Sequence, residues 1–225
     1  MGNEDGIVER YQTVYQAGTG EITEKKSRFI ADVFPVSSKE QAEAELEKIK
    51  KQYWDARHHC WAYVIGTDQP LERFSDDGEP SGTAGKPILE VIRGQELYNV
   101  LVVVTRYFGG TLLGTGGLVR AYTGASIEGL AHSMIITKIK GVKLKIRTDY
   151  TGLGKIQYIL GKASLPILDN IYGENVDILA LVPAGEENRL RAEITEGTNG
   201  KSVIEKEGEC WFAIVDGRVE IFAEQ

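Results

Sequence analysis

The run from Tyr98 to Tyr107 is almost entirely apolar and β-branched, and it constrains the fold more than any other stretch. A run this apolar predicts a strand that is covered on both faces. Two polar loops rich in glycine flank it, at residues 74–87 and 108–117. Glycine is favoured where the backbone needs positive φ or where another group approaches closely. We therefore expect a shaped surface around a buried strand, and this surface is the candidate site.

The rest of the first half alternates short strands and helices. Polar and apolar residues alternate around 12–16 and 28–36, which predicts two strands that pair, separated by Gly18-Thr19-Gly20. Helical spacing of apolar residues predicts an amphipathic helix over 38–53, with Ser37-Ser38 as its cap. Further segments are expected as a strand at 59–65, a short helix at 85–93 and a helix at 118–133.

A new pattern of period two begins at Gly141. Strands are expected at 141–147, 167–172, 176–183 and 203–215, and helices at 153–163 and 186–195. This order is β-α-β-β-α-β, the ferredoxin-like motif. We therefore predict an α+β protein of two domains, an α/β domain at 1–138 and a ferredoxin-like domain at 139–225.

Composition and charge exclude several classes of protein. The 225 residues are 42% hydrophobic and 26% charged, which is ordinary for a soluble protein. No apolar run approaches the roughly 18–20 residues of a membrane span, and residues 1–5 are acidic where a secretory signal would be basic, so we expect a cytoplasmic protein without a membrane partner. Cys60 and Cys210 are expected as buried free thiols. The net charge of −7 argues against nucleic-acid binding through overall charge, so such binding needs a local patch.

Neither glycine-rich loop matches a known phosphate fingerprint. Gly82 lies only three positions before Gly85, and Pro87 follows the lysine, so the P-loop spacing is absent. The second loop has Val119 where the dinucleotide fingerprint has its last glycine. A looser anion site stays open at the helix that follows Gly117, with basic residues near it in sequence. The alternative is that these glycines only make tight turns.

The polar residues of this region are of the types that form a metal site or a catalytic nucleophile. On a strand, His58 and Cys60 point to one face and His59 to the other, and carboxylates follow in the first loop. The spacing matches no metal motif, so a core or hydrogen-bonded role is favoured, with no metal and no cofactor. Ser81 near the acidic residues also allows a hydrolase. The acidic run itself has the composition of a solvated turn.

Arg106 ends the apolar strand and is costly to bury without a partner. We predict that it forms a salt bridge to the acidic loop or takes part in the site. No catalytic residue is assigned. The candidate ligand surface comprises His58, Asp76, Asp77, Glu79, Ser81, Lys86, Arg106, Gly109, Gly110, Gly116, Gly117 and Arg120.

A second candidate surface lies on the first strand of the second domain. Lys143, Lys145 and Arg147 alternate with apolar residues, so one strand face is basic and is a candidate nucleic-acid patch. Sheets of this topology that bind RNA carry aromatic rings that stack on bases. Because this strand has no ring beside its basic residues, a solvated sheet face is the favoured alternative.

Three blocks carry a family resemblance: His-His-Cys-Trp-Ala-Tyr at 58–63, and residues 74–87 and 102–122. They resemble the signature blocks of the Impact/YigZ family, in its bacterial two-domain form. The resemblance implies a first domain similar to the second domain of a small-subunit ribosomal protein and to domain IV of the translocating elongation factor. It implies a second domain similar to domain V of that factor. Eukaryotic Impact proteins regulate translation by competing for the activator of an initiation-factor kinase.

The expected function is therefore a non-catalytic binding or regulatory protein associated with translation. Its partner would be RNA, the ribosome or a translation factor, with an anion or phosphate at the glycine-rich loops. The alternative is a hydrolase or phosphate-ligand enzyme that uses His58, Asp76, Asp77, Ser81 and Arg106. A cleft that gathers those side chains within hydrogen-bond reach would favour the enzyme.

Overall fold

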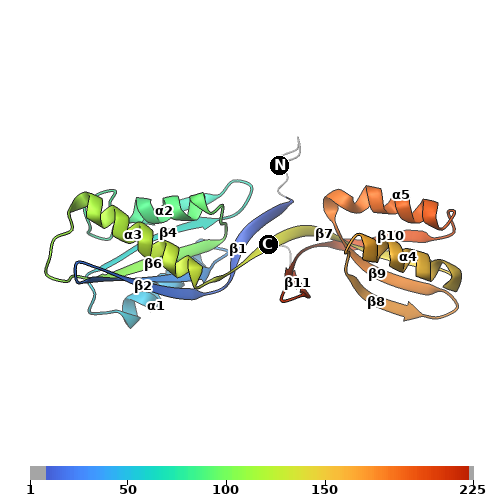
Figure 1. Cartoon of the computed structure of the whole chain (residues 1–225), viewed down its shortest axis with the longest axis horizontal. Coiled ribbons are helices and arrows are strands. Elements are labelled where there is room, and N and C mark those ends of the chain that lie inside the picture. The colour runs from blue at the N-terminus through green and yellow to red at the C-terminus, as the bar shows by residue number, and fades with distance from the viewer. Residues whose placement is uncertain (1–8, 223–225) are drawn as a thin grey trace. The chain divides into compact units, whose positions relative to one another are not determined.

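The computed structural model describes residues 9–222 and divides into two compact units (Figure 1). The first unit covers residues 11–137, and the second covers residues 138–222 together with Glu9 and Arg10. Each unit has its own hydrophobic core. The outermost residues of the two predicted domains lie outside the described range. Within that range, no helix has both the length and the apolar character needed to cross a membrane.

The first unit is built on one antiparallel sheet of five strands in the order β2-β3-β6-β4-β5. The strands are β2 (Gly18–Glu24), β3 (Ser27–Pro35), β4 (His58–Ile65), β5 (Leu71–Ser75) and β6 (Val100–Tyr107). The apolar run forms β6, the middle strand, and its residues from Val100 to Arg106 are buried. The prediction of a strand covered on both faces is confirmed.

Helices cover both faces of this sheet. They are α1 (Lys39–Gln52), α2 (Gly85–Gly94) and α3 (Gly114–Ala131). α1 packs on one face through Ala42, Leu46 and Ile49, as their helical spacing predicts, and the Ser38 side chain accepts from the Gln41 amide to cap it. α2 and α3 close the larger core on the opposite face. Figure 1 shows α1 on the other side of the sheet from α2 and α3.

The predicted pairing of strands 12–16 and 28–36 is wrong. β1 (Arg10–Gln16) pairs with β7 (Met134–Thr148), whereas β3 pairs with β2 and β6. The residues that we expected as a linker, Gly18-Thr19-Gly20, begin β2. The turn into β3 is made by Lys25 and Lys26, which both have positive φ.

Close packing explains why glycine occurs inside β2. A Cβ atom on Gly18 would lie 2.4 Å from the carbonyl oxygen of His132, and one on Gly20 would lie 2.5 Å from the carbonyl carbon of Glu128. These glycines admit the end of α3 against the strand, so they mark a close approach of two elements rather than a turn.

The second unit has the predicted ferredoxin-like topology. Its elements are β7 (Met134–Thr148), α4 (Tyr150–Lys162), β8 (Ile167–Tyr172), β9 (Val176–Pro183), the short 3₁₀ helix η1 (Ala184–Glu186), α5 (Glu187–Gly197), β10 (Val203–Val215) and β11 (Arg218–Phe222). The sheet order is β11-β10-β7-β9-β8, so β11 is an added edge strand that the sequence pattern did not predict. The core of this unit lies between the sheet and the two α-helices. The prediction of a two-domain α+β protein is confirmed.

Candidate ligand-binding site

The first glycine-rich loop joins β5 to α2, and the Asp76 carboxylate organises it. Asp76 Oδ2 accepts from the Gly82 amide at 2.8 Å, while Oδ1 accepts from the amides of Ala84 and Gly85 at 3.0 and 2.9 Å. A carboxylate at this place satisfies amides that a helix start leaves without partners and interacts favourably with the helix dipole. Asp76 therefore occupies the N-terminus of α2, where an anion would otherwise bind.

The neighbouring Asp77 ties the loop to the start of β4. Its Oδ2 atom accepts from the His59 amide at 2.6 Å, and its carbonyl oxygen lies 2.8 Å from His58 Nδ1. Only a protonated Nδ1 can donate to a carbonyl oxygen, so this contact assigns the proton of His58 to Nδ1. Asp77 has a φ of 41°, a left-handed conformation that these contacts hold in place. Asp77 and His58 therefore both help to hold the loop in its conformation.

Arg106 forms the predicted salt bridge to the acidic loop. Its Nη1 atom donates to Glu79 Oε1 at 2.6 Å, and the two side chains are only 7% and 4% exposed. The guanidinium lies over the ring of Phe29 at 5.4 Å and over that of Phe108 at 5.5 Å, measured to the ring centroids. The Tyr122 hydroxyl donates to the same Glu79 oxygen at 2.8 Å. This charge-assisted pair joins the loop to β6 and α3.

Cys60 extends this buried network. Its sulfur lies 3.0 Å from the Asp76 carbonyl oxygen and 3.3 Å from the Tyr122 hydroxyl. Burial raises the pKa of the Cys60 thiol and the pKa of the Tyr122 hydroxyl well above their ordinary values. A thiol held in its neutral form is a poor nucleophile. Cys60 and Cys210 are buried free thiols, as predicted.

The second glycine-rich loop is anchored at Gly109. Its amide donates to Ser27 Oγ at 3.1 Å, and a Cβ atom at this position would lie 2.1 Å from the carbonyl carbon of Lys26. Only glycine fits this contact between the loop and the β2–β3 turn. Gly109 is therefore a packing residue, and it fixes where the exposed part of the loop begins.

Beyond Gly109 the loop is open to solvent. Gly110 has positive φ, and a Cβ atom on Gly110 or Gly116 would meet no atom within 4 Å. Gly117 differs, since a Cβ there would lie 2.9 Å from the Leu113 Cβ. Leu113, the residue before α3, has an apolar side chain that accepts no hydrogen bond from the first amides of the helix. The first-turn amides of α3 thus keep the geometry that favours an anion, and the anion site stays a prediction.

The remaining predicted residues lie on the surface. Ser81, Lys86 and Arg120 are exposed. Lys86 lines a shallow groove of about 440 Å³ between α2 and α3, together with Val119. Two large apolar side chains of the second loop are also exposed, Phe108 at 51% and Leu112 at 83%. The exposed loop surface therefore combines apolar, basic and glycine positions.

The geometry of a hydrolase is not assembled. Within residues 9–222, no hydrogen bond joins Ser81 to His58. The carboxylates that could orient a base are already bound to backbone amides or to Arg106. The same range holds no group of three or more histidine, cysteine or acidic residues arranged to bind a metal.

The candidate nucleic-acid patch on β7 is partly neutralised. Arg147 donates to both oxygens of Asp177 at 2.7 and 2.9 Å, and Lys145 Nζ lies 3.3 Å from the same carboxylate. The hydrogen bonds from Arg147 are the main cause that lowers the pKa of Asp177 to about 2. Among the described residues, Lys143 has no ion pair. β9 places this acid opposite Arg147, so the positive charge of the strand face is partly neutralised, and its binding to nucleic acid stays a prediction.

The sequence did not indicate the role of several residues in this region. Tyr122 and Ser27 join the two loops to the core. Helical spacing places Tyr122 on the apolar face of its helix but does not reveal the contacts of its hydroxyl, and no local pattern marks Ser27. Trp61 and Tyr63 also went unassigned, although their spacing of two on β4 places both rings on one face of the sheet. That spacing is a signal which a search for paired aromatic residues would have found.

Comparison with known proteins gives matches over most of the chain. A sequence model of the Impact N-terminal domain matches residues 25–130, and one described as a domain of unknown function, DUF1949, matches residues 146–201. IMPACT family member YvyE from Bacillus subtilis is 45% identical over 206 residues, which cover 92% of this chain and 94% of that protein. IMPACT family member YigZ from Escherichia coli is 36% identical over 178 residues, covering 78% and 87%. A crystal structure of a hypothetical protein is 34% identical with a TM-score of 0.58, covering 88% of this chain and 97% of that one.

Fold and site together define a class, a two-domain α+β protein in which a buried ion pair ties the first glycine-rich loop to the central strand. The matches extend from the loops of the first unit into the second. The chain belongs to the IMPACT family, as its signature blocks predicted.

Proposed function

We propose that this protein is a non-catalytic binding protein that acts in translation in the cytoplasm and contacts RNA, the ribosome or a translation factor. The role in translation is supported by membership of the IMPACT family, since the resemblance implies that eukaryotic members regulate translation. The proposed contact surface is the exposed side of the two glycine-rich loops. The proposed ligand group is an anion, such as a phosphate, at the first turn of α3.

The observation that carries this proposal is that the side chains which could act as acids or bases are already bound to other groups of the protein. Asp76, Asp77 and Glu79 each accept hydrogen bonds from the protein itself, and Arg106 is buried against Glu79. A general base needs a lone pair within reach of its substrate, and a nucleophile needs such a base beside it. These side chains hold the loop in shape, so the loop serves better as a binding surface than as a catalytic centre.

The exposed side of the loops has the composition of a contact surface. Phe108 and Leu112 offer apolar area, while Lys86 and Arg120 offer positive charge in a protein that is acidic overall. Exposed aromatic rings stack on unpaired bases, and exposed apolar side chains anchor protein partners. The surface thus fits either kind of translation partner, and positive charge next to it favours a ligand that carries phosphate.

Sedimentation with ribosomes at low and at high salt tests the proposal. We expect the full chain to sediment with ribosomes at low salt and to dissociate as salt rises, because phosphate contacts are screened. The variant Lys86→Glu/Arg120→Glu should lose this binding. The variant Lys48→Glu/Lys51→Glu changes the charge equally on α1 and should keep it. If the two variants sediment alike, or if the chain never sediments, the loop surface is not the contact site.

A further inference from the structure

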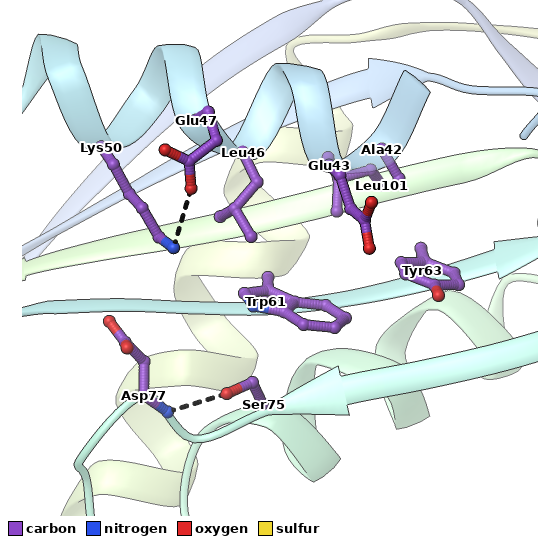
Figure 2. Close-up of a pocket in the computed structure, with 10 residues that line it drawn as sticks. All are labelled: Ala42, Glu43, Leu46, Glu47, Lys50, Trp61, Tyr63, Ser75, Asp77 and Leu101. Carbon is purple, nitrogen blue, oxygen red and sulfur yellow. Dashed lines mark hydrogen bonds and ion pairs between the residues drawn. The ribbon is translucent and has the colours of Figure 1, made fainter. Parts of the chain in front are cut away.

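We propose that the groove between α1 and strands β4 and β5 binds an extended peptide segment that carries arginine or lysine. The groove has a volume of about 460 Å³ and lies on the α1 face of the sheet (Figure 2). It goes beyond the function proposed above, because its rings and the glutamates of α1 are separate from the loop surface, and only Ser75 and Asp77 belong to both the groove and the 74–87 loop. The occupant follows from the rings, the charges and the strand edge that line it.

Two aromatic side chains of β4 form the floor of the groove. The rings of Trp61 and Tyr63 stack with their planes 6° apart and their centroids 5.4 Å apart. Tyr63 is buried, whereas Trp61 is partly exposed. A tryptophan face that is fixed by a stacked neighbour and open to solvent attracts a cation through its π electrons, and guanidinium groups are the commonest protein partner.

The walls of the groove are predominantly acidic. Glu43 and Glu47 extend from α1 on one side of Trp61, and Asp77 lies on the other side, as Figure 2 shows. Among the described residues that line the groove, only Lys50 carries a positive charge. Its Nζ atom lies 3.2 Å from Glu47 Oε1. Lys39, which does not line the groove, pairs with Glu43 at 3.4 Å. Exposed ion pairs of these kinds contribute little, so a ligand cation can replace either lysine. This charge attracts a basic peptide and repels the phosphates of a nucleic acid.

The edge of the sheet supplies the reason for an extended segment. β5 is the last strand in the sheet order, and a peptide can add to such an edge through main-chain hydrogen bonds. Trp61 stands opposite Ser75 in the register of β4 and β5, so side chains at every second position of an added strand would face the same side as Trp61. Arginine at alternate positions would then meet both the ring and the carboxylates.

Isothermal titration of the full chain with a blocked octapeptide of alternating arginine and threonine tests the proposal. We expect saturable binding of this peptide, and none of the same peptide with glutamate in place of arginine. Changing Glu43→Gln/Glu47→Gln should raise Kd about tenfold, and Trp61→Leu should have an effect of similar size. The control Glu40→Gln/Glu45→Gln removes two charges from α1 outside the groove and should leave Kd within about twofold.

The glutamine variants protect the test against misfolding, since both residues are at the surface of α1. Equal binding of the arginine and glutamate peptides would overturn the proposal, and so would a Kd that Glu43→Gln/Glu47→Gln leaves unchanged. A short single-stranded oligouridine is the second probe. Binding of this RNA that Trp61→Leu abolishes would also overturn the proposal, because the groove would then take bases in place of basic side chains.

Discussion

Asp76, Asp77 and Glu79 lie within four positions of one another, yet their carboxylates bind donors on different parts of the fold. Asp76 binds the start of α2, Asp77 binds β4, and Glu79 binds Arg106 on β6. The simple interpretation of this run as a solvated turn is wrong at Glu79, whose side chain is only 4% exposed. At the scale of single residues, the acidic loop is a set of structural ties.

The buried pair of Arg106 and Glu79 carries the first prediction. We expect Arg106→Met to lower the free energy of unfolding by about 3–5 kcal/mol, because it leaves a buried carboxylate without its partner. Urea denaturation measures this loss. The double variant Arg106→Met/Glu79→Leu should recover most of it, since no lone charge remains. Arg120→Met, at an exposed position, is the control, and an equal effect of both single arginine variants would contradict the prediction.

The raised pKa values of Cys60 and Tyr122 predict a loss of stability in alkali. In an unfolded chain these groups titrate near ~8.5 and ~10. The folded protein keeps both protons at higher pH, because burial raises each pKa. The contribution of these two groups to the free energy of unfolding should therefore be constant below about pH 8 and fall as pH rises further. Urea denaturation at several pH values checks this.

Tyr122→Phe should reduce the alkaline slope, because it removes one of the two protons that the folded state retains. Tyr158→Phe changes an exposed tyrosine in the second unit and serves as the matched control. Identical slopes for the two variants between about pH 9 and 11 would show that Tyr122 does not hold its proton in the way its burial implies.

At the scale of elements, both helices of the site begin at a glycine. α3 begins at Gly114, whereas the sequence pattern placed its start at Leu118. Glycine disfavours helix, so propensity alone moves the expected start past the glycines, although the helix begins among them. α2 begins at Gly85, where a Cβ would lie 2.7 Å from the Ser75 carbonyl carbon. That contact and the Asp76 carboxylate set its first residue.

The role of Asp76 at the start of α2 carries the next prediction. We expect Asp76→Ala to lower the free energy of unfolding by about 2–3 kcal/mol, since a helix cap is lost and part-buried amides are left without an acceptor. Hydrogen exchange should quicken at the amides of Gly82, Ala84 and Gly85. Asp68→Ala, in an exposed turn, should change neither quantity. Unchanged exchange at these three amides would show that Asp76 is dispensable for the loop.

At the scale of the molecule, each unit of the described chain has its own buried apolar residues, and β7 runs from the residues of the first unit into those of the second. In the first unit these residues form two clusters, one on each face of the five-stranded sheet. In the second unit the main cluster lies under α4 and α5, with a smaller one around Leu181 and Phe212. Each unit therefore has enough buried apolar area to be a candidate for independent folding.

We predict that the domains at 1–138 and 139–225 fold separately. Each fragment, expressed alone, should unfold in one cooperative transition and give a dispersed NMR spectrum. A fragment that ends at residue 120 cuts α3 before Tyr122 and should not fold, because it removes part of the first core. Fragments 1–138 and 139–225 that become folded only when mixed would contradict the prediction.

The sequence by itself determined those features that depend on local periodicity or on the chemistry of one residue. These features are the apolar run of β6, the order of elements in the second unit, the need of Arg106 for an acidic partner and the blocks that identify the family. Only the tertiary structure decided which carboxylate pairs with Arg106, why glycine occurs in β2, and how Trp61 comes to lie near Glu43. Each of these depends on contacts between segments far apart in the chain. The spacing of residues within one segment does not determine which distant segment packs against it.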